Sequence, residues 1–171
     1  MNFKNTKKGF TLIELLVVIA IIGLLATLAV VALGNARLKS RDAKRVSDIK
    51  QVQTALELRF VENDNYPYEG TGGDIALGAT VSIISDALDI SGPASGSTYM
   101  GLVPKDPSIS AATPLCTSAS SVVCAYAYAQ SAAAGANSYE IWFFLEGATG
   151  GLQGGIHCAS ENGIANSGTC V

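Results

Sequence analysis

Residues 8–16 read KGFTLIELL, and they open the most apolar part of the chain. From Leu15 to Ala36 no residue carries a formal charge, and Leu, Ile, Val and Ala dominate. As an α-helix these 22 residues extend about 33 Å at roughly 1.5 Å per residue, enough to cross a bilayer core of about 30 Å. The stretch therefore predicts a membrane-length helix.

One acid, Glu14, lies just inside this apolar segment, and three lysines precede it within residues 4–8. A lone carboxylate at membrane depth is costly and requires a cationic partner. The local sequence supplies such a partner only if the chain is cut after Gly9. The cut would create a new amino terminus at Phe10, four residues before the acid.

Residues 9–15, GFTLIEL, resemble the processing site of type IV pilins and of the pseudopilins of type II secretion. The shared features are a short basic leader, Gly9 before the cut, Phe10 after it, Glu14 four positions further on, and an unbroken apolar helix. This resemblance covers residues 7–34. It implies cleavage by a prepilin peptidase between Gly9 and Phe10, and methylation of the new Phe10 amine.

The resemblance also implies a role for Glu14 in assembly. In a filament of this family, Glu14 of one subunit would lie beside the Phe10 amine of its neighbour. Such a pair neutralises two charges in an apolar core, where an unpaired carboxylate is strongly unfavourable. It also fixes the axial register, because a slip by one subunit leaves both charges alone. A simpler interpretation is that Glu14 favours the positive end of its own helix, and both can hold together.

Residues 1–9 are interpreted as a targeting leader. The apolar run exceeds the h-region of about 7–15 residues in an ordinary secretory signal, and the plain alternative is an uncleaved signal anchor. Basic residues are more numerous in residues 37–45 than in the leader, and by the positive-inside rule they would place residues 37–45 in the cytoplasm. The resemblance implies the opposite, with the leader cytoplasmic and the head outside. We follow the resemblance, with which the late cysteines agree.

The helix is predicted to continue to residue 65 and to become one-sided after residue 36. No proline occurs between residues 10 and 65, whereas Pro67 follows a turn-forming segment and cannot continue a helix. Side chains at three- and four-residue steps mark its inner face: Val46, Ile49, Gln53, Leu56 and Phe60. The predicted domains are a leader (1–9), a transmembrane and filament-core helix (10–36), an amphipathic helix that docks on the head (37–65), and a globular head (66–171).

The head is predicted to combine a short helix with an antiparallel sheet. Apolar residues at helical spacing favour the helix: Leu77, Val81, Ile84 and Leu88. Alternation predicts strands at residues 124–130, 139–146 and 152–158, and residues 161–171 are interpreted as a polar tail. The fold class is therefore α+β: a long N-terminal helix packed on a small C-terminal antiparallel sheet, type IV pilin-like.

All four cysteines lie in the head, at Cys116, Cys124, Cys158 and Cys170. An even number in an exported domain indicates two disulfides in an oxidising compartment. Three connectivities are possible; pairing Cys116 with Cys124 and Cys158 with Cys170 is favoured, because each closes a short polar loop. The alternative is buried free thiols. Zinc is not expected, since no CxxC or closely spaced Cys/His cluster occurs.

Basic and acidic residues are distributed unevenly along the chain. Residues 35–62 carry seven basic and four acidic residues, whereas residues 63–171 carry one basic and nine acidic residues. An acidic head argues against nucleic acid as a partner. The basic residues 35–62 of one subunit and the acidic residues 63–171 of a neighbouring subunit could attract one another, which is a hypothesis about assembly.

The sequence gives little support to an enzyme. His157 is the only histidine and adjoins Cys158, but neighbours on a strand point to opposite faces and cannot form a catalytic pair. His157 is expected to lie on the surface beside a disulfide. No cofactor is predicted. Some major pseudopilins bind calcium in the head, so the resemblance leaves room for that ion alone.

The resemblance implies a structural subunit that is stored in the inner membrane as a single-pass protein and polymerises into a type IV pilus-like filament. One alternative with the same chemistry is a pseudopilin of a type II secretion or DNA-uptake system. An alternative of another class is a membrane-tethered binding module that does not polymerise. The implied partners are other copies of the chain, the prepilin peptidase and methyltransferase, assembly platform proteins, and membrane lipid before assembly. The final location would be an extracellular pilus or a periplasmic pseudopilus.

Overall fold

The computed structural model describes residues 9–67, 74–79, 81, 83–86, 95–109, 113–130, 137–166 and 170. The predicted leader therefore lies outside the described residues, except for Gly9. The chain forms two compact units, Met1–Arg37 and Leu38–Val171, which are treated separately below. Helix α1 (Leu12–Asn63) contributes to both units.

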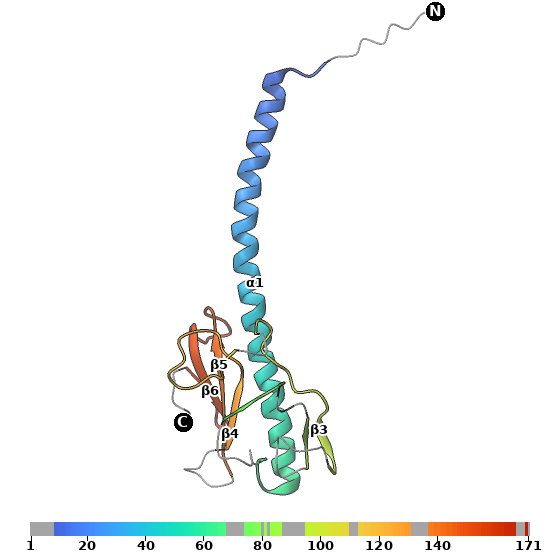
Figure 1. The fold of residues 1–171 in the computed structure, drawn as a ribbon, viewed down its shortest axis with the longest axis vertical. Helices are drawn as coiled ribbons and strands as arrows, with labels where there is room; N and C mark the ends of the chain where they lie inside the picture. Colours follow the sequence, from blue (N-terminus) through green and yellow to red (C-terminus); the bar gives the residue numbers. More distant parts are fainter. Residues whose placement is uncertain are drawn as a thin grey trace, which may run out of the picture. The chain divides into compact units, whose positions relative to one another are not determined.

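Helix α1 runs without a break through 52 residues, as Figure 1 shows. Its sequence contains no proline, which would remove an i→i−4 hydrogen bond and kink the helix. The helix ends where Asp64 takes a left-handed conformation (φ 55°) and donates its backbone N–H to the Phe60 carbonyl at 2.8 Å. The predicted long helix is confirmed.

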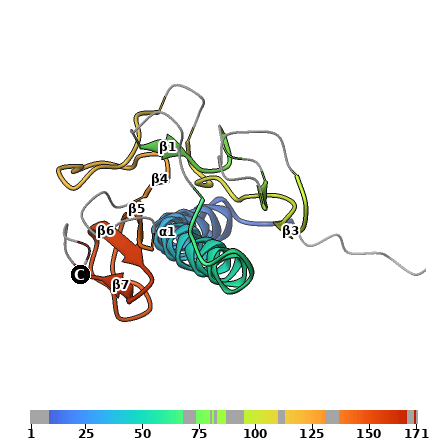
Figure 2. The same ribbon diagram turned by 90° about the horizontal axis from the view of Figure 1, so that it is seen from below.

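The head contains a five-stranded sheet in the order β1-β4-β5-β6-β7, and all its neighbouring strands are antiparallel. A separate antiparallel pair joins β2 and β3. Figures 1 and 2 show β4, β5 and β6 on one side of the head portion of α1 and β3 on another. The strands are β1 (Ile75–Ala76), β2 (Ile84–Ser85), β3 (Thr98–Met100), β4 (Ala127–Gln130), β5 (Tyr139–Leu145), β6 (Gly155–Ser160) and β7 (Gly163–Ala165).

Strand β5 separates two buried clusters. On one face, side chains at alternate positions pack with the inner face of α1, and every one of them is at most 1% exposed: Tyr139, Ile141, Phe143 and Leu145. On the other face, Trp142 is 7% exposed and belongs to a smaller cluster with Cys116, Cys124 and Cys158. The predicted α+β fold with its antiparallel sheet is confirmed, and both faces of β5 are covered.

The predicted short helix in residues 77–88 is wrong for the residues that the structure describes. Leu77 and Val81 instead form a bridge across a tight turn, and Ile84 begins β2. Gly78 makes this turn with φ 72°, and a Cβ there would lie 2.6 Å from the Pro104 carbonyl oxygen. The helical spacing of apolar residues misled the prediction, because β-branched residues bury equally well in short extended pieces.

The C-terminal part of the sheet also differs from the prediction. The third predicted strand begins later, at Gly155, and residues expected in a polar tail form β7. Strands β6 and β7 are joined by a tight turn at residues 161–162 and pair from Cys158 with Ala165 to Ser160 with Gly163. Strand β7 has only three residues and directly follows the polar turn residues Glu161 and Asn162, which is why the sequence pattern did not predict it.

Two disulfides close the loops next to the sheet. Cys116 is bonded to Cys124, with Cα atoms 4.9 Å apart, and Cys158 is bonded to Cys170, with Cα atoms 5.3 Å apart. These are the neighbour pairings that the sequence favours among the three possibilities. The second bond joins β6 to the C-terminal segment.

Candidate functional site

The sequence-predicted site lies at the beginning of α1. Gly9 and Phe10 precede the helix, and Phe10 is 88% exposed. Among the residues that the structure describes, no heavy atom outside the chain neighbours of Gly9 lies within 4 Å of the position that a Cβ on Gly9 would take. The Gly9–Phe10 peptide bond is therefore in an open, non-helical segment that an enzyme can approach.

Thr11 and Glu14 form a reciprocal cap on the first turn of α1. The Thr11 backbone N–H and hydroxyl donate to Glu14 Oε2 at 2.8 and 2.7 Å, while the Glu14 N–H donates to Thr11 Oγ1 at 3.3 Å. Because α1 begins at Leu12, Thr11 is the N-cap and Glu14 is the third helical residue, which is the geometry of a capping box. The Glu14 carboxylate is thus held by its own chain.

Sequence reasoning missed Thr11. The pattern Thr-x-x-Glu before an apolar run is itself a signal for a capping box, and it could have been found from residues 11–14 alone. Among the residues that the structure describes, both bonds to Glu14 reach Oε2 and none reaches Oε1. One carboxylate oxygen therefore stays available for a further donor.

The first half of α1 presents a continuous apolar surface. Its most apolar 18-residue window has a mean hydropathy of 3.1 and is 0% buried within the chain, so α1 is long and apolar enough to cross a membrane. Every large apolar side chain on this segment is exposed: Phe10, Leu12, Ile13, Leu15, Leu16, Val17, Val18, Ile19, Ile21, Ile22, Leu24, Leu25, Leu28, Val30, Val31 and Leu33. Such a surface requires lipid or other protein to cover it.

The beginning of the chain matches a known sequence motif. The prokaryotic N-terminal methylation motif matches residues 4–30, which include Gly9, Phe10, Thr11 and Glu14. The amino-terminal segment therefore carries the sequence features of that motif. No solved structure gives a significant match.

Proteins similar to this chain include a type II secretion core protein and type IV pilins. It is 40% identical over 72 residues to the type II secretion system core protein G of Escherichia coli (strain K12), covering 42% of this chain and 50% of that protein. It is 37% identical to the type IV major fimbrial protein FimA of Dichelobacter nodosus, covering 46% and 47%. It is 31% identical to the type IV major pilin protein PilA of Myxococcus xanthus (strain DK1622), covering 56% and 49%. The chain spans about half the length of the curated relatives that it matches.

A second polar constellation lies within the head, around the fully buried side chain of Arg45 on α1. Its guanidinium donates to Asp42 at 2.6 Å, to Asp106 at 2.6 and 3.2 Å, and to Glu146 at 2.7 Å. Burial lowers the pKa of Arg45, but the hydrogen bonds to Asp106, Glu146 and Asp42 outweigh burial and raise the pKa. Arg45 is therefore a permanently charged centre that joins α1 to two distant loops.

The same cluster holds the turn after β5. Arg41 donates two hydrogen bonds to the Glu146 carboxylate at 2.8 and 2.6 Å, and Asp42 accepts the backbone N–H groups of Glu146 and Gly147 at 3.0 and 2.8 Å. The hydrogen bond from Arg41, with a smaller contribution from Arg45, lowers the pKa of Glu146 to about 2 despite partial burial. These contacts join α1 to the turn after β5 and stabilise the head.

The expectation that His157 lies on the surface is wrong. The ring is 1% exposed and stacks on Phe143, with ring centroids 5.4 Å apart. Its Nδ1 lies 3.1 Å from the Ala165 carbonyl oxygen, and its Nε2 lies 2.8 Å from the Gln153 carbonyl oxygen. His157 therefore ties β6 to β7 and to the preceding turn, and strand β7, which the sequence analysis missed, is what covers it.

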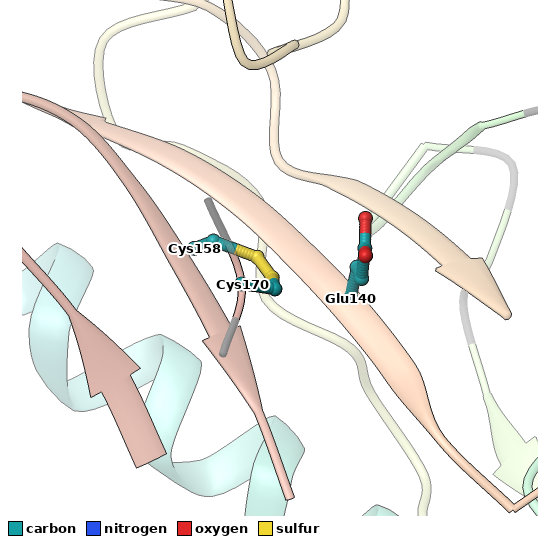
Figure 3. Close-up of side chains that lie close together, drawn as sticks. All are labelled: Glu140, Cys158 and Cys170. Atoms are coloured by element: carbon teal, nitrogen blue, oxygen red, sulfur yellow. A yellow bond between two sulfur atoms is a disulfide. The ribbon is translucent and has the colours of Figure 1, made fainter. Parts of the chain in front are cut away.

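Glu140, Cys158 and Cys170 are the one group among the described residues whose potential metal-ligand atoms lie within 4.8 Å of one another. Figure 3 shows the two sulfur atoms joined in the disulfide, with Glu140 on the neighbouring strand β5. A disulfide sulfur is not a thiolate and does not supply the charged ligand that zinc requires. The donor set reduces to one carboxylate, which does not fit a metal site.

Proposed function

We propose that this chain is the structural subunit of a type IV pilus-like filament, processed after Gly9 and polymerised through residues 10–36. The observation that carries the proposal is the apolar surface of α1, whose side chains the described part of the chain leaves exposed. Burial of a large aliphatic side chain contributes about 1.5–3 kcal/mol. Lipid covers this surface before assembly, and the helices of neighbouring subunits cover it in the filament.

Glu14 would have a different partner in each state. In the isolated subunit the capping box holds its Oε2, as in the contacts with Thr11 at 2.7 and 2.8 Å. In the filament the processed amine of a neighbouring Phe10 would approach the same carboxylate. Methylation keeps the positive charge of that amine, so the pair remains neutral overall. The register role of Glu14 follows from the cost of leaving either charge unpaired in an apolar core.

Processing and location belong to the same proposal. A prepilin peptidase would cut the open Gly9–Phe10 bond, a methyltransferase would modify Phe10, and assembly platform proteins would feed the subunit into the filament. The head would lie outside the cytoplasm, which the two disulfides support, because such bonds persist in oxidising compartments.

A pseudopilin of a type II secretion system is the second candidate. The 40% identity to a type II secretion core protein G favours it, and the processing and register chemistry are the same. The two candidates differ in where the polymer lies, on the cell surface or within the envelope.

Mass spectrometry of the protein purified from cells tests the shared part of the proposal. We expect a mature chain that begins at Phe10 and carries a methylated amine. Sheared surface fractions then separate the candidates, because a pilin is recovered in filaments and a pseudopilin stays with the cell envelope. An intact chain that begins at Met1 would contradict both candidates and would favour a membrane-tethered module.

A further inference from the structure

The carboxylate of Glu140 lies next to the disulfide that joins β6 to the C-terminal segment. Glu140 and Trp142 alternate along β5 with the residues that pack against α1, and Trp142 is paired with Cys158 of β6. Glu140 is therefore a diagonal neighbour of Cys158 on the same face of the sheet. A carboxylate oxygen of Glu140 and the sulfur atoms of Cys158 and Cys170 lie within 4.8 Å of one another, and Figure 3 shows the three side chains together.

This carboxylate has no compensating charge within the described part of the chain. None of the ion pairs and hydrogen bonds between the described residues involves the Glu140 side chain. Lys105 is the one lysine or arginine in residues 63–171, and it lines a depression with Lys44 and Asp48 of α1, the helix that packs on the opposite face of β5. The sulfur atoms of this disulfide therefore lie in the field of an unpaired negative charge.

We propose that Glu140 protects the Cys158–Cys170 disulfide from reduction by thiolates. The thiolate attacks Cys170 Sγ, because Cys170 is partly exposed whereas Cys158 is 1% exposed. A new sulfur–sulfur bond forms, and Cys158 leaves as a thiolate. A second external thiolate then attacks the mixed disulfide and releases Cys170 as a thiolate, so the external thiols are oxidised to a disulfide and the protein gains the two electrons.

The charge of the attacking group explains why a carboxylate opposes this reaction. The thiolate brings a negative charge to the disulfide, and in the transition state this charge is shared by three sulfur atoms. Two of these atoms are the sulfurs within 4.8 Å of the Glu140 oxygen. Repulsion between like charges at such a distance raises the free energy of the transition state and slows the attack.

The second disulfide of the head is protected in another way. Cys116 and Cys124 are 0% and 1% exposed, so burial alone keeps an external thiolate away from their sulfur atoms. Cys170 is partly exposed, and by exposure its bond to Cys158 would be the easier of the two to reduce. The charge of Glu140 thus acts at the disulfide that burial protects less.

The rate of disulfide reduction in the full-length protein in detergent micelles tests this role. Glu140→Gln keeps the size of the side chain and removes its charge. With dithiothreitol at mildly alkaline pH and low salt, we expect Cys158–Cys170 to be reduced on the order of tenfold faster in this variant. Differential alkylation and mass spectrometry follow each disulfide separately. The difference should shrink at 1 M salt, where the Debye length falls to about 3 Å from about 10 Å at 0.1 M.

Asp64→Asn is the matched control, because it also removes one negative charge from the head. Asp64 is exposed at the end of α1, which packs on the other face of β5, and asparagine tolerates its left-handed conformation. This variant should leave the reduction rate of Cys158–Cys170 unchanged. A rate increase equal to that of Glu140→Gln would show that the net charge of the head, and not the position of Glu140, determines the rate.

Reduction by a neutral phosphine separates the effect of charge from a loosening of the structure. Tris(hydroxypropyl)phosphine forms a phosphorus–sulfur bond as Cys158 leaves, and water then converts the adduct to the phosphine oxide and a thiol. Because this reagent brings no negative charge, we expect Glu140→Gln to change its rate much less than the rate with dithiothreitol.

Three results would overturn the proposal. The first is an unchanged rate with dithiothreitol in Glu140→Gln. The second is an equal acceleration with the phosphine, and the third is an equal acceleration at Cys116–Cys124, because both indicate a loosened head. None of them bears on processing at Gly9, so failure here leaves the proposed function untouched.

Discussion

At the scale of single residues, Thr11 determines how the Glu14 carboxylate is held in the subunit. Replacement of Thr11 by valine removes the hydroxyl that donates to Glu14 at 2.7 Å and accepts its N–H at 3.3 Å. Loss of an N-cap side chain costs about 1 kcal/mol. We expect faster amide hydrogen exchange in residues 12–15 of the protein in micelles.

Thr27→Val is the matched control for this measurement. Thr27 lies in the same apolar helix, but its hydroxyl only donates to the Leu24 carbonyl at 2.8 Å, a bond that contributes little to helix stability. Its variant should leave exchange at the first turn unchanged. Equal acceleration in both variants would show that Thr11 has no special role as a cap.

The charge of Glu14 can be separated from its capping role with two substitutions. Gln at this position keeps an oxygen that can complete the capping box, whereas Ala removes both the oxygen and the charge. We expect processing after Gly9 in both variants but loss of filament assembly in both, because neither pairs with the amine of a neighbouring Phe10. Electron microscopy and mass spectrometry of cell fractions measure the two outcomes. Normal filaments from Glu14→Gln would contradict the register role.

At the scale of the elements, Arg45 fastens α1 to the loops around Asp106 and Glu146. Removal of one member of a buried charge cluster costs roughly 3–5 kcal/mol, because the remaining charges stay buried without compensation. Arg45→Ala should therefore lower the thermal unfolding temperature of the protein strongly. Lys44→Ala is the control: its ammonium pairs with Asp48 at 3.1 Å but is 54% exposed, and an exposed pair contributes about 0–1 kcal/mol. Similar losses in both variants would show that the cluster has no special importance.

The same cluster gives the head a specific acid sensitivity. The pKa of Glu146 is lowered from 4.5 to about 2, first by the hydrogen bond from Arg41. Because the pKa of Glu146 is lower in the folded than in the unfolded protein, its ionised carboxylate stabilises the fold fully above about pH 4.5, and this stabilisation is lost as the pH falls toward 2. Unfolding midpoints measured across that window should fall less steeply in Glu146→Gln than in the unmodified protein. An identical slope would show that Glu146 does not carry the effect.

At the scale of the whole molecule, features that depend on residues close in sequence could be predicted, whereas features that depend on residues far apart in sequence could not. Helix α1 and the faces of β5 depend on local periodicity, and both could be predicted. The ion cluster joins Arg45 to partners 61 and 101 residues away, which no local pattern reports. The burial of His157 was not predicted for a similar reason, since strand β7, whose Ala165 carbonyl lies 3.1 Å from its Nδ1, has only three residues. Gly9, Phe10 and Glu14 stay predictions, because their chemistry depends on other proteins.

The unbroken backbone of α1 has a consequence for how a filament could grow and dissolve. Peptide groups inside the apolar half of α1 form their hydrogen bonds within the helix. Movement of this helix from lipid into a helix bundle would therefore change only the neighbours of its side chains. Lipid tails are about as apolar as leucine, and the hydrophobic effect gives little preference for either environment. The balance between the stored and the polymerised subunit would then depend on small terms: close packing between stems and a single charge pair. If the free energies of the stored and the polymerised subunit differ so little, such a polymer could gain and lose subunits without unfolding any part of α1.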